Sequence, residues 1–387
     1  MSMDIVDTDP RDDETRAMLR DAAARFVERE GGFEARVAAA AAPDGFSRER
    51  WRAFADMGWL ALGLPEDCGG LGAAGDAAVV AHALGRSIAL EPWLAHVGLA
   101  GPLLAALRAG PDGDPGGRCG ALLEGLAAGE RMPALAAWEP QGRHDAFDVE
   151  ARATREGDGW RLDGTKTLVL GGGAADVLLV VARLDGATRD PHGLAVFEVP
   201  AGAPGLARRA LPTYDGRQAA DLRLAGVRID AGARLGGDAD AWPAIERAID
   251  QAAALACVEA AGTMRAVLEA TRAYLQQRRQ FGRPLAANQV LRHRLVDLFV
   301  DVEQARAISE TAVARLDEAP AARRRAVSLA KAFVSPAARR CGEEGIQLHG
   351  AIGMTDEVAI GHLAKRLVGF ANLLGDEAWH LERLAAS

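Results

Sequence analysis

An arginine, an aromatic residue and two glutamines follow one another closely in the C-terminal half of the chain. The segment YLQQRRQFGRPLAANQ contains Arg278, Gln280, Phe281 and Gln289. The planar guanidinium of Arg278 offers a donor fork suited to a pyrophosphate, and the ring of Phe281 offers a flat apolar face for a ring system. The alternative is that Arg278 is a solvated cation at a helix end and Phe281 a core residue at the following turn.

A second segment, QLHGAIG at residues 347–353, combines a glutamine with two glycines. Glycines allow backbone N–H groups to approach a phosphate or an adenine closely, so Gln347 and Gly350 are candidate ligand contacts. In isolation, the same segment is equally typical of a plain loop between two helices.

Helical periodicity dominates the first third and the last third of the chain. Apolar residues recur at helical spacing over 15–28, and Ser47 is a suitable N-cap for the next helix. Further helices are predicted over 76–88, 99–108 and 120–128. After residue 241, one long helix is predicted to about 279, and Pro284 is placed to open a second, to about 318. A third is predicted over 323–345, with two short helices after the loop at 349–356. Long amphipathic helices of this kind pack as a bundle.

From Met132 to about residue 235 the period becomes two, and turn residues recur at short intervals. The segment EGDG at 156–159 is typical of a hairpin turn. Several short strands in about 100 residues predict a compact β-barrel or sandwich. Strands are expected at 151–155, 160–162, 167–170, 177–182, 194–199 and 221–224.

Composition excludes several function classes. The 387 residues carry a formal net charge of −9, which argues against a nucleic-acid face. No apolar stretch reaches the length of about 20 residues that a membrane span needs, and the acidic N-terminus does not resemble a secretion signal. The four cysteines have no paired spacing, which indicates thiols in a reducing compartment such as the cytoplasm rather than disulfides or metal ligands.

The α–β–α order and both motifs resemble the acyl-CoA dehydrogenase family, of which the chain looks like a divergent bacterial-type member. The first motif is similar to the family's Y-x-x-x-R-x-x-F-G signature, and the second to its Q-x-x-G-G-x-G segment. Weaker matches are Trp138-Glu139-Pro140, where the family has T-E-P, and Gly164-x-Lys166. The resemblance implies an α+β fold with an N-terminal helical domain (1–131), a middle β-barrel or sandwich domain (132–236) and a C-terminal four-helix bundle (237–387).

The resemblance also implies an FAD cofactor bound between subunits. Residues matching the family's contacts to a neighbour's FAD are Arg278, Gln280, Phe281, Gln289, Gln347 and Gly350. On the subunit's own side, the two flavin-contacting threonines of the family are replaced by Trp138 and Leu170, and a nearby serine by His144. The cis side of the expected flavin site therefore departs from the family pattern, while the trans side is retained.

The family's catalytic base is a glutamate in one of two places. Counting back from Glu382-Arg383, the first place falls on Asp376, or on Glu377 if the register shifts by one residue. The second falls near Ala252, which cannot act as a base. Because Asp is also a favoured helix cap, Asp376 has a plain structural alternative.

The resemblance predicts an FAD-dependent acyl-CoA dehydrogenase of lipid catabolism that introduces an α,β double bond into an acyl-CoA thioester. It implies electron-transfer flavoprotein or a similar acceptor as partner. A homo-tetramer, a homo-dimer or a hetero-oligomer with a second such subunit would fit. The first alternative is a non-catalytic partner subunit that completes a neighbour's FAD site, and the second is a helical binding protein that only keeps the fold. The acyl group, and the choice between dehydrogenase and oxidase, are not readable from the sequence.

Overall fold

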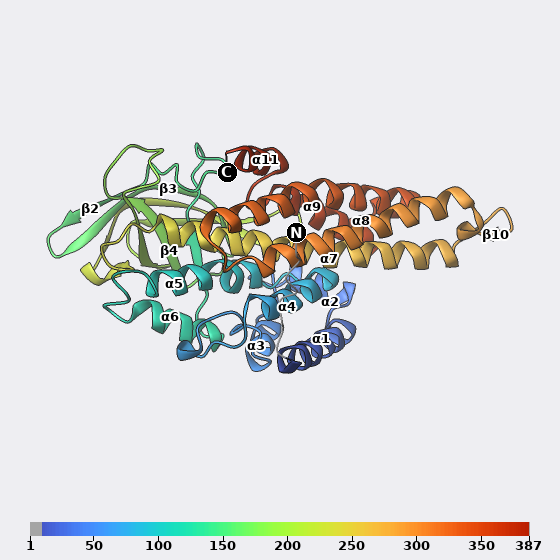
Figure 1. Ribbon diagram of the computed structural model, residues 1–387, viewed down its shortest axis with the longest axis horizontal. Coiled ribbons are helices and arrows are strands. Elements are labelled where there is room, and N and C mark those ends of the chain that lie inside the picture. Colours follow the sequence, from blue (N-terminus) through green and yellow to red (C-terminus); the bar gives the residue numbers. More distant parts are fainter. Residues whose placement is uncertain (1–9, 387) are drawn as a thin grey trace, which may run out of the picture.

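The N-terminal third is a layer of helices packed on one another (Figure 1). The fold is described from a computed structural model, which places residues 10–386. Phe26, Phe54 and Trp59 form a buried aromatic cluster with ring centroids 5.1–5.4 Å apart. The predicted N-cap is confirmed, because the Ser47 side chain accepts the backbone N–H of Arg50 at 3.2 Å. The helices are α1 (Pro10–Glu30), α2 (Phe33–Ala40), α3 (Arg48–Asp56), α4 (Ala74–Ser87), η2 (Leu94–Ala100), α5 (Gly101–Arg108) and α6 (Arg118–Ala127).

The middle of the chain is one connected eight-stranded sheet, in the order β6-β7-β3-β2-β4-β5-β8, with β1 paired to β4. The predicted hairpin is confirmed, because Glu156 pairs with Gly159 across the turn between β2 and β3. Two of the predicted strands are parts of one long strand, β3. The strands are β1 (Pro133–Ala136), β2 (Arg152–Glu156), β3 (Gly159–Leu170), β4 (Val177–Arg183), β5 (Leu194–Pro200), β6 (Leu206–Pro212), β7 (Gln218–Ile229) and β8 (Arg234–Leu235).

The C-terminal part is a bundle in which α7 (Trp242–Gln277), α8 (Gln289–Ala314), α9 (Pro320–His349) and α10 (Ala359–Asn372) pack on one another. A short final helix, α11 (Glu377–Ala385), packs on α9. The prediction that Pro284 opens the second long helix is wrong. Instead, β9 (Arg279–Gln280) and β10 (Arg283–Pro284) form a hairpin, and α8 begins five residues after Pro284, at Gln289.

The sheet and the β9–β10 hairpin lie at opposite ends of the molecule (Figure 1). Because α7 has 36 residues, it is about 54 Å long and runs from the sheet to the hairpin. The N-terminal helices cover one side of the bundle, and α4 packs directly on α7. The α+β class is therefore confirmed. Within residues 10–386, no helix is long and apolar enough to cross a membrane.

Candidate functional site

A cavity of about 490 Å³ lies where the N-terminal helices, the sheet and the bundle meet. Its walls come from α4 and η2, the end of β3, the loop between β6 and β7, the middle of α7 and the C-terminal half of α10. Most of the lining is apolar, which is typical of a pocket for a small organic ligand. The apolar residues include Leu84, Trp93, Leu94, Leu170, Leu211, Val368 and Leu373.

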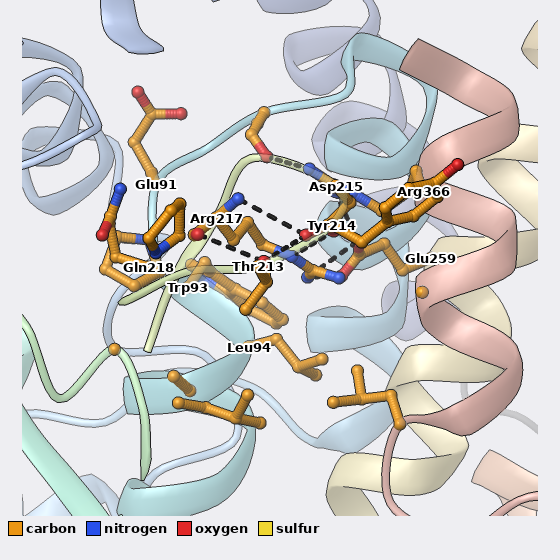
Figure 2. Close-up of a pocket in the computed structure, with 18 of the residues that line it drawn as sticks. Glu91, Trp93, Leu94, Thr213, Tyr214, Asp215, Arg217, Gln218, Glu259 and Arg366 are labelled. Carbon is orange, nitrogen blue, oxygen red and sulfur yellow. Dashed lines mark hydrogen bonds and ion pairs between the residues drawn. The ribbon is translucent and has the colours of Figure 1, made fainter. Parts of the chain in front are cut away.

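One wall of the cavity is charged. Arg217 bridges two carboxylates, with Nε 2.7 Å from Asp215 and Nη1 3.1 Å from Glu259. Arg366 of α10 bridges the same two carboxylates, at 2.7 Å each. Burial alone would raise the pKa of Asp215, but Arg217 and Arg366 hold it well below its ordinary value. Figure 2 shows this charged cluster gathered on one side of the cavity, with Leu94 facing it.

Leu168 lines the cavity in an unusual conformation. Its φ is +50°, in the left-handed region that non-glycine residues rarely adopt, and its side chain is half exposed. Asp221 supports this turn by accepting the Leu168 N–H at 3.2 Å and the Thr167 hydroxyl at 2.9 Å. Strained backbone of this kind is frequent at ligand sites, because the strain presents a side chain that a relaxed strand would turn away. Leu168 thus offers an exposed apolar face beside Leu170.

Of the two residues expected on the cis side of the flavin, Leu170 lines the cavity and Trp138 does not. The indole of Trp138 is half-buried, and its Nε1–H donates to the carbonyl of His144 at 3.4 Å. His144 lies in turn 3.4 Å from Asp376, between its Nε2 and the carboxylate Oδ2. The bulkier residues at positions 138 and 144 therefore contact each other and the C-terminal segment.

Asp376 is the N-cap of α11. Its Oδ1 accepts the backbone N–H of Trp379 at 2.8 Å, and this bond holds the pKa of Asp376 below its ordinary value. The preceding Gly375 has φ +104°, and a Cβ there would lie 2.5 Å from the His380 ring. Leu373 lines the cavity, whereas Asp376 is partly exposed on the His144 side of the segment, and Glu377 is exposed.

The residues predicted to contact a neighbour's FAD lie together at the far tip of the bundle. Arg278, Gln280, Gln289, Gln347 and Gly350 are exposed. Phe281 is 99% exposed with φ +52°, so it is not a core residue of the turn.

The two sequence motifs meet at this tip. The ring of Tyr274 stacks on His349, with centroids 4.5 Å apart. Arg278 is 19 residues beyond Glu259 along α7, so the tip lies about 28 Å from the cavity of the same chain.

The charged wall was not predicted from the sequence. Asp215 and Arg217 follow a strand that was also missed, and Arg366 lies in a helix predicted only coarsely. Glu259 gave an available signal, because it is a lone charge within the alanine-rich run at 252–261. Its side chain is 9% exposed, and such a buried charge needs a partner from elsewhere in the fold.

The chain matches known proteins over almost its whole length. Sequence models of the acyl-CoA dehydrogenase N-terminal, middle and C-terminal domains match residues 13–108, 134–227 and 240–387. The acyl-CoA dehydrogenase FadE27 of Mycobacterium tuberculosis is 32% identical over 350 residues, covering 88% of this chain and 87% of that protein. The acyl-CoA dehydrogenase IpdE2 of Mycolicibacterium smegmatis is 31% identical over 375 residues, covering 96% and 98%.

A solved structure agrees with these sequence matches. A chain of the ChsE4-ChsE5 complex from Mycobacterium tuberculosis superposes with a TM-score of 0.83 at 27% identity, covering 96% of both chains. FAD-dependent dehydrogenation of acyl-CoA, an oxidation of a CH–CH bond, is the function of the matched family. The chain therefore belongs to the acyl-CoA dehydrogenase family of FAD-dependent oxidoreductases.

Proposed function

We propose that this chain is a catalytic acyl-CoA dehydrogenase subunit whose substrate acyl group occupies the cavity between the sheet and the bundle. The observation that carries the proposal is the cavity itself, which joins the strained Leu168 and Leu170 of β3 to Leu373, just before the expected base. A volume of about 490 Å³ is within the usual range for small-molecule pockets.

The chemistry of the available donors fits FAD. Arg278, Phe281 and Gln347 present a guanidinium, an exposed ring and an amide on one tip of the bundle. At about 28 Å from the cavity of the same chain, they would serve the FAD of a neighbouring subunit. Leu168 and Leu170 would supply the apolar face on the subunit's own side. FAD, when bound, supplies the acceptor for the hydride that leaves the β-carbon.

Asp376 is the residue that we propose as the base for the α-proton, with Glu377 as the alternative. Its low pKa keeps the carboxylate ionised and able to accept a proton. A bound thioester would remove water from the carboxylate and raise its pKa toward the working pH. Because Oδ1 caps α11, Oδ2 is the oxygen available for the proton.

A non-catalytic partner subunit is the second candidate. Two observations favour it: the Asp376 carboxylate faces His144 and lies outside the cavity lining, and a chain of a two-component complex, ChsE4-ChsE5, superposes on this one. In that case, the exposed Arg278 and Phe281 would complete the FAD site of a different, glutamate-bearing subunit.

We also propose the finer features of the assembly. The chain would form a homo-dimer or homo-tetramer, or a hetero-oligomer with a second subunit, and would pass electrons to electron-transfer flavoprotein or a similar acceptor. The division at residues 131 and 236 follows the change from helices to strands and back. A cytoplasmic location is supported by the four cysteines, which are buried and unpaired.

The test is to purify the chain alone and to record its flavin absorbance spectrum and native mass. A flavin-containing oligomer that is reduced by an acyl-CoA supports the catalytic proposal. A chain that retains flavin only when co-purified with a second subunit supports the partner alternative.

A further inference from the structure

Together with the buried Arg36, which lies outside the cavity lining, the charged wall of the cavity has three guanidinium groups against the carboxylates of Asp215 and Glu259. Arg36 of α2 joins the cluster by donating to the backbone carbonyl of Asp215, and its side chain is buried. Burial lowers the pKa of Arg36 to about 10, so it is still charged near neutral pH. Arg217 and Arg366 pair with the carboxylates of Asp215 and Glu259, and Arg36 is a third positive group beside them.

The neighbouring acid does not neutralise this excess. Glu91 also lines the cavity and acts to raise the pKa of Arg36, but it pairs with Arg50 of α3 at 3.7 Å. Counting both of these residues leaves four positive groups against three negative ones. A buried charge without a counter-charge is unfavourable, because it has lost water without gaining a partner. An anion in the cavity would supply the missing negative charge.

Of the six terminal nitrogens of these three arginines, one is left over within residues 10–386. Both terminal nitrogens of Arg36 donate to backbone carbonyls, of Ile88 and Asp215. Those of Arg366 bond to Glu259 and to the carbonyl of Ala89. Arg217 uses Nη1 for Glu259, and within residues 10–386 its Nη2 has no hydrogen-bond partner.

The free nitrogen belongs to the more exposed of the two arginines that line the cavity. The side chain of Arg217 is 18% exposed, against 2% for that of Arg366. Figure 2 shows the Arg217 guanidinium held between Asp215 and Glu259. Its orientation is therefore fixed before any ligand arrives, which lowers the entropic cost of binding.

We propose that Arg217 binds a carboxylate carried by the acyl chain at a position remote from the thioester, which makes Arg217 a specificity-determining residue of the cavity. The inference rests on the proposed function, since it names the class of acyl group that the cavity accepts. The free Nη2 donates to one carboxylate oxygen, and the excess positive charge of the cluster balances the anion. The apolar walls hold the carbon skeleton between the two ends.

A purely structural role for Arg217 makes a different prediction. The ion pairs also tie the loop between β6 and β7 to α7 and α10. If that were the whole role, the cavity would discriminate against a carboxylate, because an apolar pocket without a partner disfavours a charged group. Whether the cavity prefers a carboxylate-ended or a methyl-ended chain therefore separates a ligand-binding role of Arg217 from a purely structural one.

The test measures binding without turnover. Thioether analogues of acyl-CoA, which cannot be oxidised through the thioester, are titrated calorimetrically into the full-length protein with its FAD. Three series of matched chain length are compared. Their chains end in a methyl group, a methyl ketone or a carboxylate. The carboxylate series is expected to bind at least about tenfold more tightly than the methyl series, the scale of one charge-assisted hydrogen bond. Equal or weaker binding of the carboxylate series overturns the proposal, and a ketone that binds as tightly overturns the assignment of an anion.

Two variants locate the effect. Arg217→Met should abolish the preference for the carboxylate, so that within this variant the carboxylate series binds no more tightly than the methyl series. Arg223→Met is the matched control, because Arg223 lies on the adjoining strand β7, exposed and outside the cavity lining, and it should retain the full preference. A preference retained in Arg217→Met overturns the proposal. If Arg217→Met does not fold, the three ligand series on wild type still decide, since their order is opposite under the two roles. Flavin reduction by acyl-CoA is recorded separately. If the protein prefers the carboxylate series but its flavin is not reduced, the proposed catalytic function is wrong and the carboxylate site at Arg217 stands.

Discussion

Glu139 and Lys166 form a buried ion pair, with Oε1 and Nζ 2.6 Å apart and both side chains at most 1% exposed. Glu139 also accepts the backbone N–H groups of Glu150 and Ala151, and Lys166 donates to the carbonyl of Ala137. The pair therefore fastens the segment that carries Trp138 to strand β3, which carries Leu168 and Leu170. Burial lowers the pKa of Lys166 to about 8, but the Glu139 carboxylate opposes this shift, so the Lys166 ammonium group stays protonated at neutral pH.

Breaking this pair on one side should destabilise the protein strongly. Glu139→Gln or Lys166→Met is expected to lower the free energy of unfolding by roughly 3–5 kcal/mol, because each leaves a buried charge without its partner. The double variant Glu139→Gln/Lys166→Met should lose clearly less free energy of unfolding than the two single variants lose together. Chemical denaturation measures all three. Glu156→Gln, which breaks the exposed pair with Arg228, is the control and should leave the free energy of unfolding almost unchanged. Additive single effects would contradict this account of the pair.

Arg278→Lys should weaken the retention of FAD by about tenfold, because a lysine keeps the charge but loses the planar donor fork. Arg279→Lys is the matched control, since Arg279 is the next residue, is also exposed and donates to the carbonyl of Gly282. Flavin content after extensive dialysis reports the difference. Equal flavin content in wild type and Arg278→Lys would remove Arg278 from the proposed site.

Asp376 can be tested as a base separately from its role as a cap. An asparagine keeps the cap, because its side-chain oxygen can still accept the N–H of Trp379. Asp376→Asn is therefore expected to unfold like wild type but to slow flavin reduction by at least about 10²-fold. Asp376→Ala removes the cap too, and should cost about 1 kcal/mol of stability. If only Glu377→Gln is inactive, Glu377 is the base.

Acidification should destabilise the protein through buried histidines. His96 is fully buried, and burial lowers its pKa to about 4 although its Nδ1 donates to the carbonyl of Pro133. Between about pH 6.5 and 4 the unfolded chain binds a proton that the folded chain does not, so stability falls as the pH falls. From pH 7 to 5, His96 alone should account for about 2 kcal/mol.

His96→Gln keeps a hydrogen-bond donor and removes this titration. Its loss of stability between pH 7 and 5 should be smaller than that of wild type by about this amount, as measured by urea unfolding at both pH values. His82 and His380 also have lowered pKa values and continue to titrate in the variant. An identical pH dependence in the two proteins would show that His96 does not contribute.

The sequence predicts the order of helices and strands where one periodicity persists, as in α7 and β4. It does not predict β1 or β6. The first is the short, fully buried run PALA, and the second, LARRALP, is largely exposed, so neither alternates between apolar and polar residues. The hairpin before α8 was missed because Pro284 fits the start of a helix as well as the end of a strand.

The tip of the bundle could be predicted because its residues lie close together in the sequence. The charged wall of the cavity could not, because Arg36, Asp215, Arg217, Glu259 and Arg366 come from four separate parts of the chain. No local spacing links these residues, and only the packing of α2, α7 and α10 around one loop brings them together. The left-handed turn at Leu168 is likewise set by Asp221, more than 50 residues away.

Anaerobic reduction of bound FAD tests the central claim most directly. The chain is purified alone, mixed with a panel of acyl-CoA thioesters in the absence of oxygen, and followed by the loss of the oxidised flavin absorbance. Bleaching by at least one thioester, slowed in Asp376→Asn or Glu377→Gln, is the result that a catalytic subunit predicts. An oxidised flavin that no thioester reduces, but that is reduced once a second, glutamate-bearing subunit is added, would contradict that claim and identify the chain as the non-catalytic partner.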